Sequence, residues 1–195
     1  MKKLTLTSLS LLLVVCSYAQ EISGGVKGGL NVSSQKVDWA YGQINTQPKL
    51  GVHIGGYLVV MLDEKMGIQP ELLLSTQGAK YKDFDGKTNM TYILVPVLFR
   101  YNFNEMFSAH AGPQFGLLLS AKAVSDGDKI DRKDDFKTLD VGAAIGVGVE
   151  LPMGFNCGAR YIFGLSQISK DVDGYGKFKS SLFQLFIAYR LFGGE

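Results

Sequence analysis

A period-two alternation of apolar and polar residues constrains this chain more than any other feature, because it is typical of a β-strand with one apolar face. The clearest example is 140–151, where Val141, Ile145 and Val149 share one face and Asp140 lies on the other. Eight such segments occur, at 22–32, 49–61, 66–79, 89–102, 106–121, 138–151, 154–168 and 180–192. Each is long enough for a tilted strand to cross a lipid bilayer, so the pattern predicts eight membrane-crossing strands.

The connections between these segments alternate strictly between short and long. The short ones are 62–65, 103–105 and 152–153, and the long, polar ones are 33–48, 80–88, 122–137 and 169–179. In an up-and-down barrel this alternation places every short turn at one end and every long loop at the other. We therefore predict an all-β, eight-stranded antiparallel up-and-down transmembrane β-barrel, with long loops outside the cell and both termini in the periplasm.

Residues 1–19 have the three parts of a signal peptide. Lys2 and Lys3 supply the positive start, 4–15 is an almost uncharged apolar run, and small residues precede an expected cut after Ala19. The rival interpretation makes Cys16 the acylated residue of a lipoprotein, but Val15 is larger than the residue such a site needs. We expect cleavage to leave one barrel domain, 20–195, in the cell outer membrane of a Gram-negative envelope.

The charge balance and the scarcity of cysteine and histidine exclude several classes of function. Loss of the first nineteen residues lowers Lys+Arg from 20 to 18, which equals the 18 Asp+Glu, so the mature chain is neutral. A neutral chain argues against a nucleic-acid partner. Cys157 would be its only cysteine, and His53 and His110 lie in no metal-binding spacing. We expect no cofactor and no metal.

Charged residues within the strands fall mostly on the polar face, which we assign to the barrel interior. These seven are Lys27, Glu71, Arg100, Asp140, Glu150, Arg160 and Arg190. An eight-stranded barrel is just wide enough inside for side chains to fill, and a buried charge needs a partner. We predict a network in which Glu71 pairs with Lys27 or Arg160, and Glu150 pairs with Arg100 or Arg190.

Aromatic residues and prolines add two further expectations. Tyr101, Phe103, Phe107, Phe155 and Tyr189 are expected near the periplasmic interface of the membrane, and Tyr81, Tyr92, Phe178 and Phe183 near the outer one. Pro70, Pro96 and Pro113 lie inside strand patterns, although proline cannot donate a ladder hydrogen bond. Their strands therefore require a bulge or a locally missing bond.

Several segments are similar to those of the PorT-type outer-membrane β-barrel proteins. The similar segments are 26–31 (VKGGLN), 51–56 (GVHIGG), 69–78 (QPELLLSTQG), 95–96 with 100–101, 111–116 (AGPQFG), and 159–161 with 164–165. The resemblance covers nearly the whole mature chain and implies an outer-membrane barrel. It implies no particular activity.

We therefore expect a non-enzymatic outer-membrane barrel whose extracellular loops serve recognition, adhesion, envelope integrity or secretion-related assembly. Its expected partners are outer-membrane lipid, the outer-membrane assembly machinery and a protein at the extracellular loops. The alternative is a narrow porin-like channel for small solutes. A barrel enzyme acting on envelope lipids or peptides is less favoured, because Ser108 and His110 share a strand face without a third residue to orient the imidazole. We predict no catalytic residue.

Overall fold

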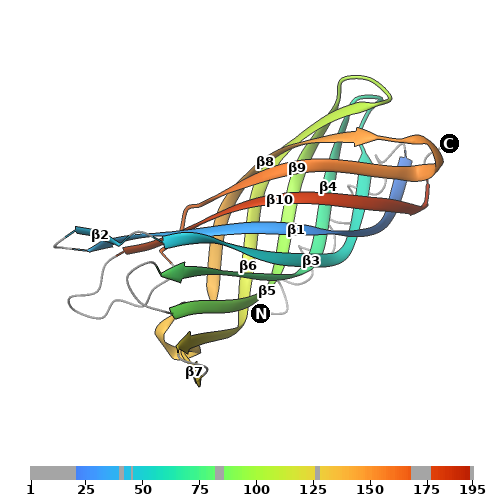
Figure 1. Cartoon of the computed structure of the whole chain (residues 1–195). Helices are drawn as coiled ribbons and strands as arrows, with labels where there is room; N and C mark the ends of the chain where they lie inside the picture. The colour runs from blue at the N-terminus through green and yellow to red at the C-terminus, as the bar shows by residue number, and fades with distance from the viewer. Residues whose placement is uncertain are drawn as a thin grey trace, which may run out of the picture.

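Eight long antiparallel strands form a single barrel in the computed structural model, which describes residues 21–39, 42–44, 46–81, 86–125, 128–167 and 177–193 (Figure 1). The long strands are β1 (Glu21–Trp39), β3 (Thr46–Met61), β4 (Met66–Tyr81), β5 (Gly86–Asn102), β6 (Phe107–Ser125), β8 (Leu139–Glu150), β9 (Phe155–Gly164) and β10 (Lys177–Phe192). Two short strands, β2 (Gly42–Ile44) and β7 (Asp128–Asp131), and two 3-10 turns, η1 (Lys133–Asp135) and η2 (Pro152–Gly154), complete the described elements.

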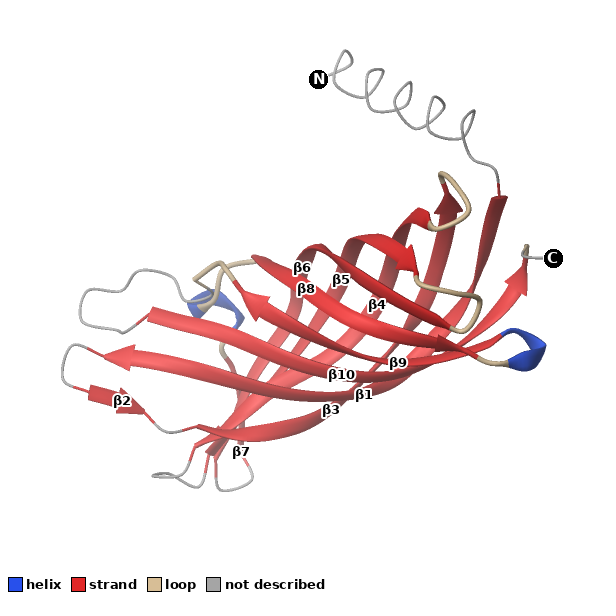
Figure 2. Ribbon diagram, turned by 90° about the horizontal axis from the view of Figure 1, so that it is seen from above, coloured by secondary structure: helices blue, strands red, loops and turns tan. Residues whose placement is uncertain are grey.

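The barrel closes because its first and last long strands pair with each other. The strand order is β1-β3-β4-β5-β6-β8-β9-β10, and β10 returns to β1 with Lys27 opposite Ala188. The predicted closed, eight-stranded antiparallel barrel is confirmed. Figure 2 shows the short connections gathered at the end where β10 finishes, while β2 and the longer strand extensions lie at the opposite end.

The strands extend further into the predicted long loops than the alternation indicated. β1 pairs with β10 as far as Asp38 opposite Lys177, and β7 folds back on β6 with Lys122 opposite Asp131. The expected loop 33–48 is therefore largely strand, and the expected loop 122–137 is strand at 122–125 and 128–131. Pairing continues there because it satisfies backbone hydrogen bonds even where no apolar face faces lipid. In contrast, β9 ends at Gly164, four residues earlier than expected.

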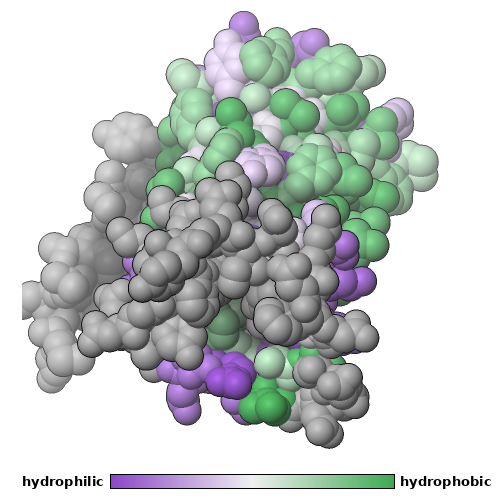
Figure 3. Space-filling model, turned by 60° about the vertical axis from the view of Figure 1, so that its left-hand side comes forward, coloured by the Kyte–Doolittle hydropathy of each residue, from purple (hydrophilic) through white to green (hydrophobic). Residues whose placement is uncertain are grey.

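Apolar side chains cover the outer wall of the barrel. Leu72, Ile145 and Ile187 are 61%, 56% and 63% exposed, as expected of residues that face lipid in a membrane. Figure 3 shows such side chains in green over the barrel wall on the face it presents. Polar residues next to them in sequence, such as Glu71 and Gln184, are almost fully buried and point into the lumen.

The three prolines that the sequence placed inside strands, Pro70, Pro96 and Pro113, interrupt the ladder without a bulge. Between β3 and β4, for example, pairing stops after Tyr57 opposite Glu71 and resumes in the same register with Val60 opposite Ile68, so that Pro70 lies in the gap. Similar two-residue gaps at unchanged register lie at Pro96 and Pro113. The missing N–H of proline explains each gap, because no ladder hydrogen bond can form from that nitrogen.

Candidate functional site in the barrel lumen

Apolar side chains occupy part of the lumen, although the alternation predicts that apolar faces point to lipid. Leu73, Met90, Tyr92, Leu94, Leu118 and Ala121 form one buried cluster against which Phe136 packs. Tyr92 is only 3% exposed. The prediction that it lies at the outer lipid interface is therefore wrong. The side chains of Tyr81 and Phe178, predicted at the same interface, lie outside the described residues.

Glu71 is the centre of a buried ionic cluster that joins three strands. Lys27 Nζ of β1 donates to its Oε1 at 2.7 Å, and Arg160 of β9 donates from Nη2 to Oε1 at 2.7 Å and from Nη1 to Oε2 at 2.9 Å. Gln69 Nε2 adds a fourth donor at 2.7 Å. Glu71 thus contacts both of its predicted partners, and the exposed fractions of the three charged side chains are 2% or less.

Aromatic and imidazole rings pack around this cluster. Lys27 Nζ lies 4.1 Å from the ring centroid of Phe186 and 5.7 Å from that of Tyr57. Arg160 Nε donates to His110 Nε2 at 3.1 Å, so this histidine nitrogen acts as an acceptor. Together these side chains fill the lumen at the level of Glu71, as the interior width of an eight-stranded barrel allows.

A second polar group surrounds His53 on the long-loop side of the ionic cluster. His53 Nδ1 lies 2.8 Å from Asn31 Oδ1, which also accepts from Gln184 Nε2 at 3.1 Å. Asn31 Nδ2 donates to Ser75 Oγ at 2.9 Å. Sequence reasoning missed these contacts because their partners come from strands far apart in the chain, and only the barrel register brings them together.

Ser108 and His110 do not form a nucleophile and base pair. Ser108 Oγ contacts the carbonyl oxygen of Gly148 at 3.5 Å, whereas the His110 ring binds Arg160. A hydroxyl that is not hydrogen-bonded to the imidazole is not activated by it. The arrangement in the lumen therefore supplies no catalytic group of the kind that the sequence had offered as an alternative.

A second ion pair lies nearer the short turns. Arg100 Nη2 binds Glu150 Oε1, and Arg100 also donates to Asn102 Oδ1 at 2.9 Å and Gln69 Oε1 at 3.2 Å. Asn156 Nδ2 donates to Glu150 at 2.6 Å. Glu150 thus contacts Arg100, one of its two predicted partners.

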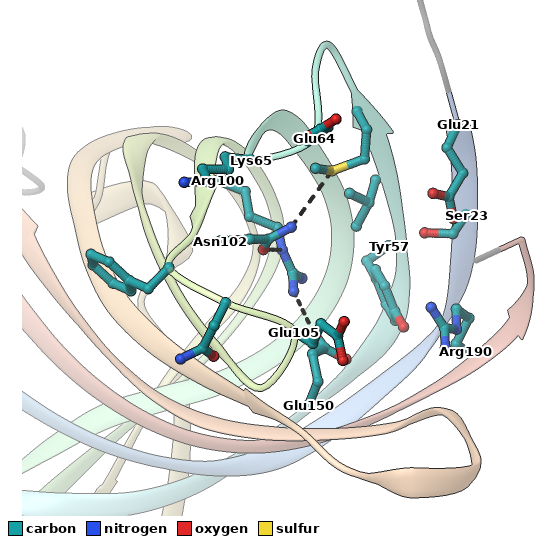
Figure 4. Close-up of a pocket in the computed structure, with 14 residues that line it drawn as sticks. Glu21, Ser23, Tyr57, Glu64, Lys65, Arg100, Asn102, Glu105, Glu150 and Arg190 are labelled. Atoms are coloured by element: carbon teal, nitrogen blue, oxygen red, sulfur yellow. Dashed lines mark hydrogen bonds and ion pairs between the residues drawn. The ribbon is translucent and has the colours of Figure 1, made fainter. Parts of the chain in front are cut away.

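The two remaining members of the predicted charge network form no ion pair within the described parts of the chain. Asp140 instead accepts a hydrogen bond from Ser166 Oγ at 2.5 Å. Arg190 lines a cavity of about 780 Å³ that opens among the short turns, together with Tyr57 and the Arg100–Glu150 pair (Figure 4). The predicted seven residues therefore form two separate ion-paired groups and two single charges.

Two absences hold for the part of the chain that the structure describes. Its His, Cys, Asp and Glu side chains include no group of three or more that could hold a metal ion. Among the same residues, no helix has both the length and the apolar character needed to span a membrane.

The family of this chain follows from its sequence match. The model of a family described as outer membrane protein beta-barrel domain matches residues 18–170. The chain belongs to this family. It is therefore an outer-membrane β-barrel protein. The membrane supplies the lipid that its exposed apolar wall requires. A search of curated proteins by sequence gave no match.

Solved structures of outer-membrane barrels share the fold of this family member. The attachment invasion locus protein Ail of Yersinia pestis, in complex with the heparin analogue sucrose octasulfate, superposes with a TM-score of 0.52 at 16% identity, covering 88% of this chain and 100% of that chain. Neisserial surface protein A gives a TM-score of 0.52 at 10% identity, covering 86% and 97%. At these identities the likeness concerns the fold alone.

Proposed function

We propose that this outer-membrane protein is a non-enzymatic barrel with a closed lumen, and that its long-loop end adheres to polyanionic material outside the cell. The main support for a closed lumen is the Lys27–Glu71–Arg160 cluster. These side chains are at most 2% exposed, and Phe186 and His110 pack beside them. A layer of charged side chains that are bonded to one another and inaccessible to solvent offers no aqueous path for a solute.

The long strand extensions supply a rigid base for recognition at the opposite end. β1 and β10 stay paired to Asp38 and Lys177, and β7 adds a short strand to the edge of β6. Binding residues on loops that a rigid scaffold positions are a common arrangement for recognition. This end of the barrel is therefore the better candidate for contact with an external partner.

Lysines on these extensions favour an anionic partner. Lys80 and Lys87 lie directly opposite each other on β4 and β5, and both are exposed. Like charges directly opposite on a sheet destabilise it, so their juxtaposition favours a counter-charge from outside the chain. Lys122 lies on the next strand, opposite Asn89 of β5 on one side and Asp131 of β7 on the other, and is also exposed. Ail, which shares this fold, was crystallised with a sulfated saccharide.

Binding to a heparin surface tests this proposal. The folded barrel should bind heparin with an affinity that falls as salt rises, and Lys80→Gln with Lys87→Gln should weaken binding by several-fold, roughly 1 kcal/mol or more for two charges. Lys65→Gln, at the short-turn end, is the matched control and should leave binding unchanged. Equal binding of all three proteins, or no binding of the wild type, would contradict the proposal.

We also propose the export route and orientation that the sequence indicates. Residues 1–19 would be removed as a signal peptide, the domain 20–195 would remain, and both termini would face the periplasm; residues 1–20 lie outside the described part of the chain. Membership of the PorT-type branch is likewise a proposal, supported by the segments that resemble it. The intact mass of the purified protein should correspond to a chain that begins at Gln20.

A further inference from the structure

The cavity at the short-turn end is a blind pocket of ligand size. Its volume of about 780 Å³ lies within the usual range for small-molecule sites, roughly 300–1,000 Å³. Its wall includes Tyr57, whose ring also contacts Lys27 of the buried ionic cluster, so the cavity ends where that cluster begins. In the proposed orientation its mouth faces the periplasm, on the opposite side from the heparin-binding lysines.

One wall of this pocket presents two polar groups that have no hydrogen-bond partner among the described residues. Arg190 forms no hydrogen bond or ion pair with any residue that the structure describes, and no hydrogen bond of the Tyr57 hydroxyl is found there either. By contrast, Arg100 on the facing wall is held by Glu150, Asn102 and Gln69. Figure 4 shows Arg190 and Tyr57 on one side of the cavity and Arg100 with Asn102 on the other.

The barrel register explains how Arg190 and Tyr57 come to face one opening. Gly25 of β1 pairs with Tyr57 of β3 on one side and with Arg190 of β10 on the other. A Cβ at Gly25 would lie 1.9 Å from the carbonyl oxygen of Tyr189, so this position requires glycine. The row Tyr57–Gly25–Arg190 therefore places a hydroxyl and a guanidinium on either side of a position that has no side chain.

We propose that this pocket binds the free α-carboxylate of a short peptide. A guanidinium with an adjacent hydroxyl donor matches a carboxylate, which accepts paired N–H bonds from arginine. Glu21, Glu64 and Glu105 also line the pocket, and they form no ion pair with residues in the described ranges. They supply carboxylates that can pair with the ammonium group of the same peptide, so the pocket as a whole suits a zwitterion.

Titration with L-alanyl-L-alanine tests the proposal on the full folded chain. Backbone amide resonances in 23–25 and 188–190 should shift in a saturable manner. The C-terminal amide of the same dipeptide should bind at least about tenfold more weakly, because it loses a charge-assisted hydrogen bond. The N-acetyl dipeptide, which keeps the carboxylate, should lose less affinity than the amide.

Variants separate this site from non-specific binding. Arg190→Gln should weaken binding of the free dipeptide by about tenfold or more, and Tyr57→Phe by less. Arg132→Gln, an exposed arginine in the long-loop half, should bind as the wild type does. The mobility of unboiled samples on gels verifies that each variant is folded, and Arg190→Lys provides a second folded variant. Equal affinity for the dipeptide and its amide, or unchanged affinity in both Arg190 variants, would overturn the proposal.

Discussion

Neutralising Glu71 should destabilise the barrel more than any other single charge change in the lumen. In Glu71→Gln, Lys27 and Arg160 would lose the one carboxylate that they share, while their own side chains stay buried at 2% and 0% exposure. The new amide keeps one acceptor oxygen, but its NH₂ group is a hydrogen-bond donor that would face the N–H donors of Lys27 and Arg160. Removing one partner of a buried ion pair typically costs 3–5 kcal/mol, so we expect the free energy of unfolding to fall by about 3–5 kcal/mol.

Lys27→Met is the comparison that shows whether the shared carboxylate is responsible for the loss of stability. That substitution leaves Arg160 and Glu71 as a balanced pair with both of their hydrogen bonds, 2.7 and 2.9 Å, so it should cost clearly less than Glu71→Gln. Arg132→Gln removes the exposed pair with Asp135 and should have little measurable effect. Urea unfolding in detergent or lipid, followed by the mobility of unboiled samples, measures all three. A loss under about 1 kcal/mol for Glu71→Gln, or a larger loss for Lys27→Met, would refute the reasoning.

Two further predictions concern packing. Leu73→Ala should lower the free energy of unfolding by about 2–5 kcal/mol, because Leu73 is 1% exposed inside the barrel. Leu72→Ala on the lipid face should lower it less. Equal losses in urea titrations would contradict the assignment of the two faces. Gly146→Ala should cost about 1–3 kcal/mol, because a Cβ there would lie 2.4 Å from His110 Nε2 and push that ring away from Arg160. Unchanged ring resonances of His110 in this variant would contradict the second prediction.

The strand number and the two ends of the barrel could be predicted because the membrane imposes simple rules. Outward residues must be apolar and every backbone group must be paired, so alternation and the order of short and long connections were sufficient. Alternation is less informative where both faces of a strand are apolar. Tyr92 lies in 90–95 (MTYILV), where alternation does not show which face meets lipid, and this is why its predicted position was wrong.

The contacts of the lumen were only partly predictable. The charges on the polar face indicated ion pairs and two candidate partners for Glu71, but nothing in the residue pattern indicates that one carboxylate binds both. That arrangement depends on register, which brings Glu71 next to residues 44 and 89 positions away. The hydrogen bond between Arg160 and His110 depends on register in the same way. So does the row Tyr57–Gly25–Arg190 beside the pocket.

Single-channel recording on the purified, folded barrel in planar bilayers tests the closed lumen most directly. We expect no discrete conductance steps from the wild-type protein, because the Lys27–Glu71–Arg160 layer fills the lumen at that level. Reproducible steps from the wild type, changed in size by Glu71→Gln, would show that solutes pass this layer and would contradict the central claim.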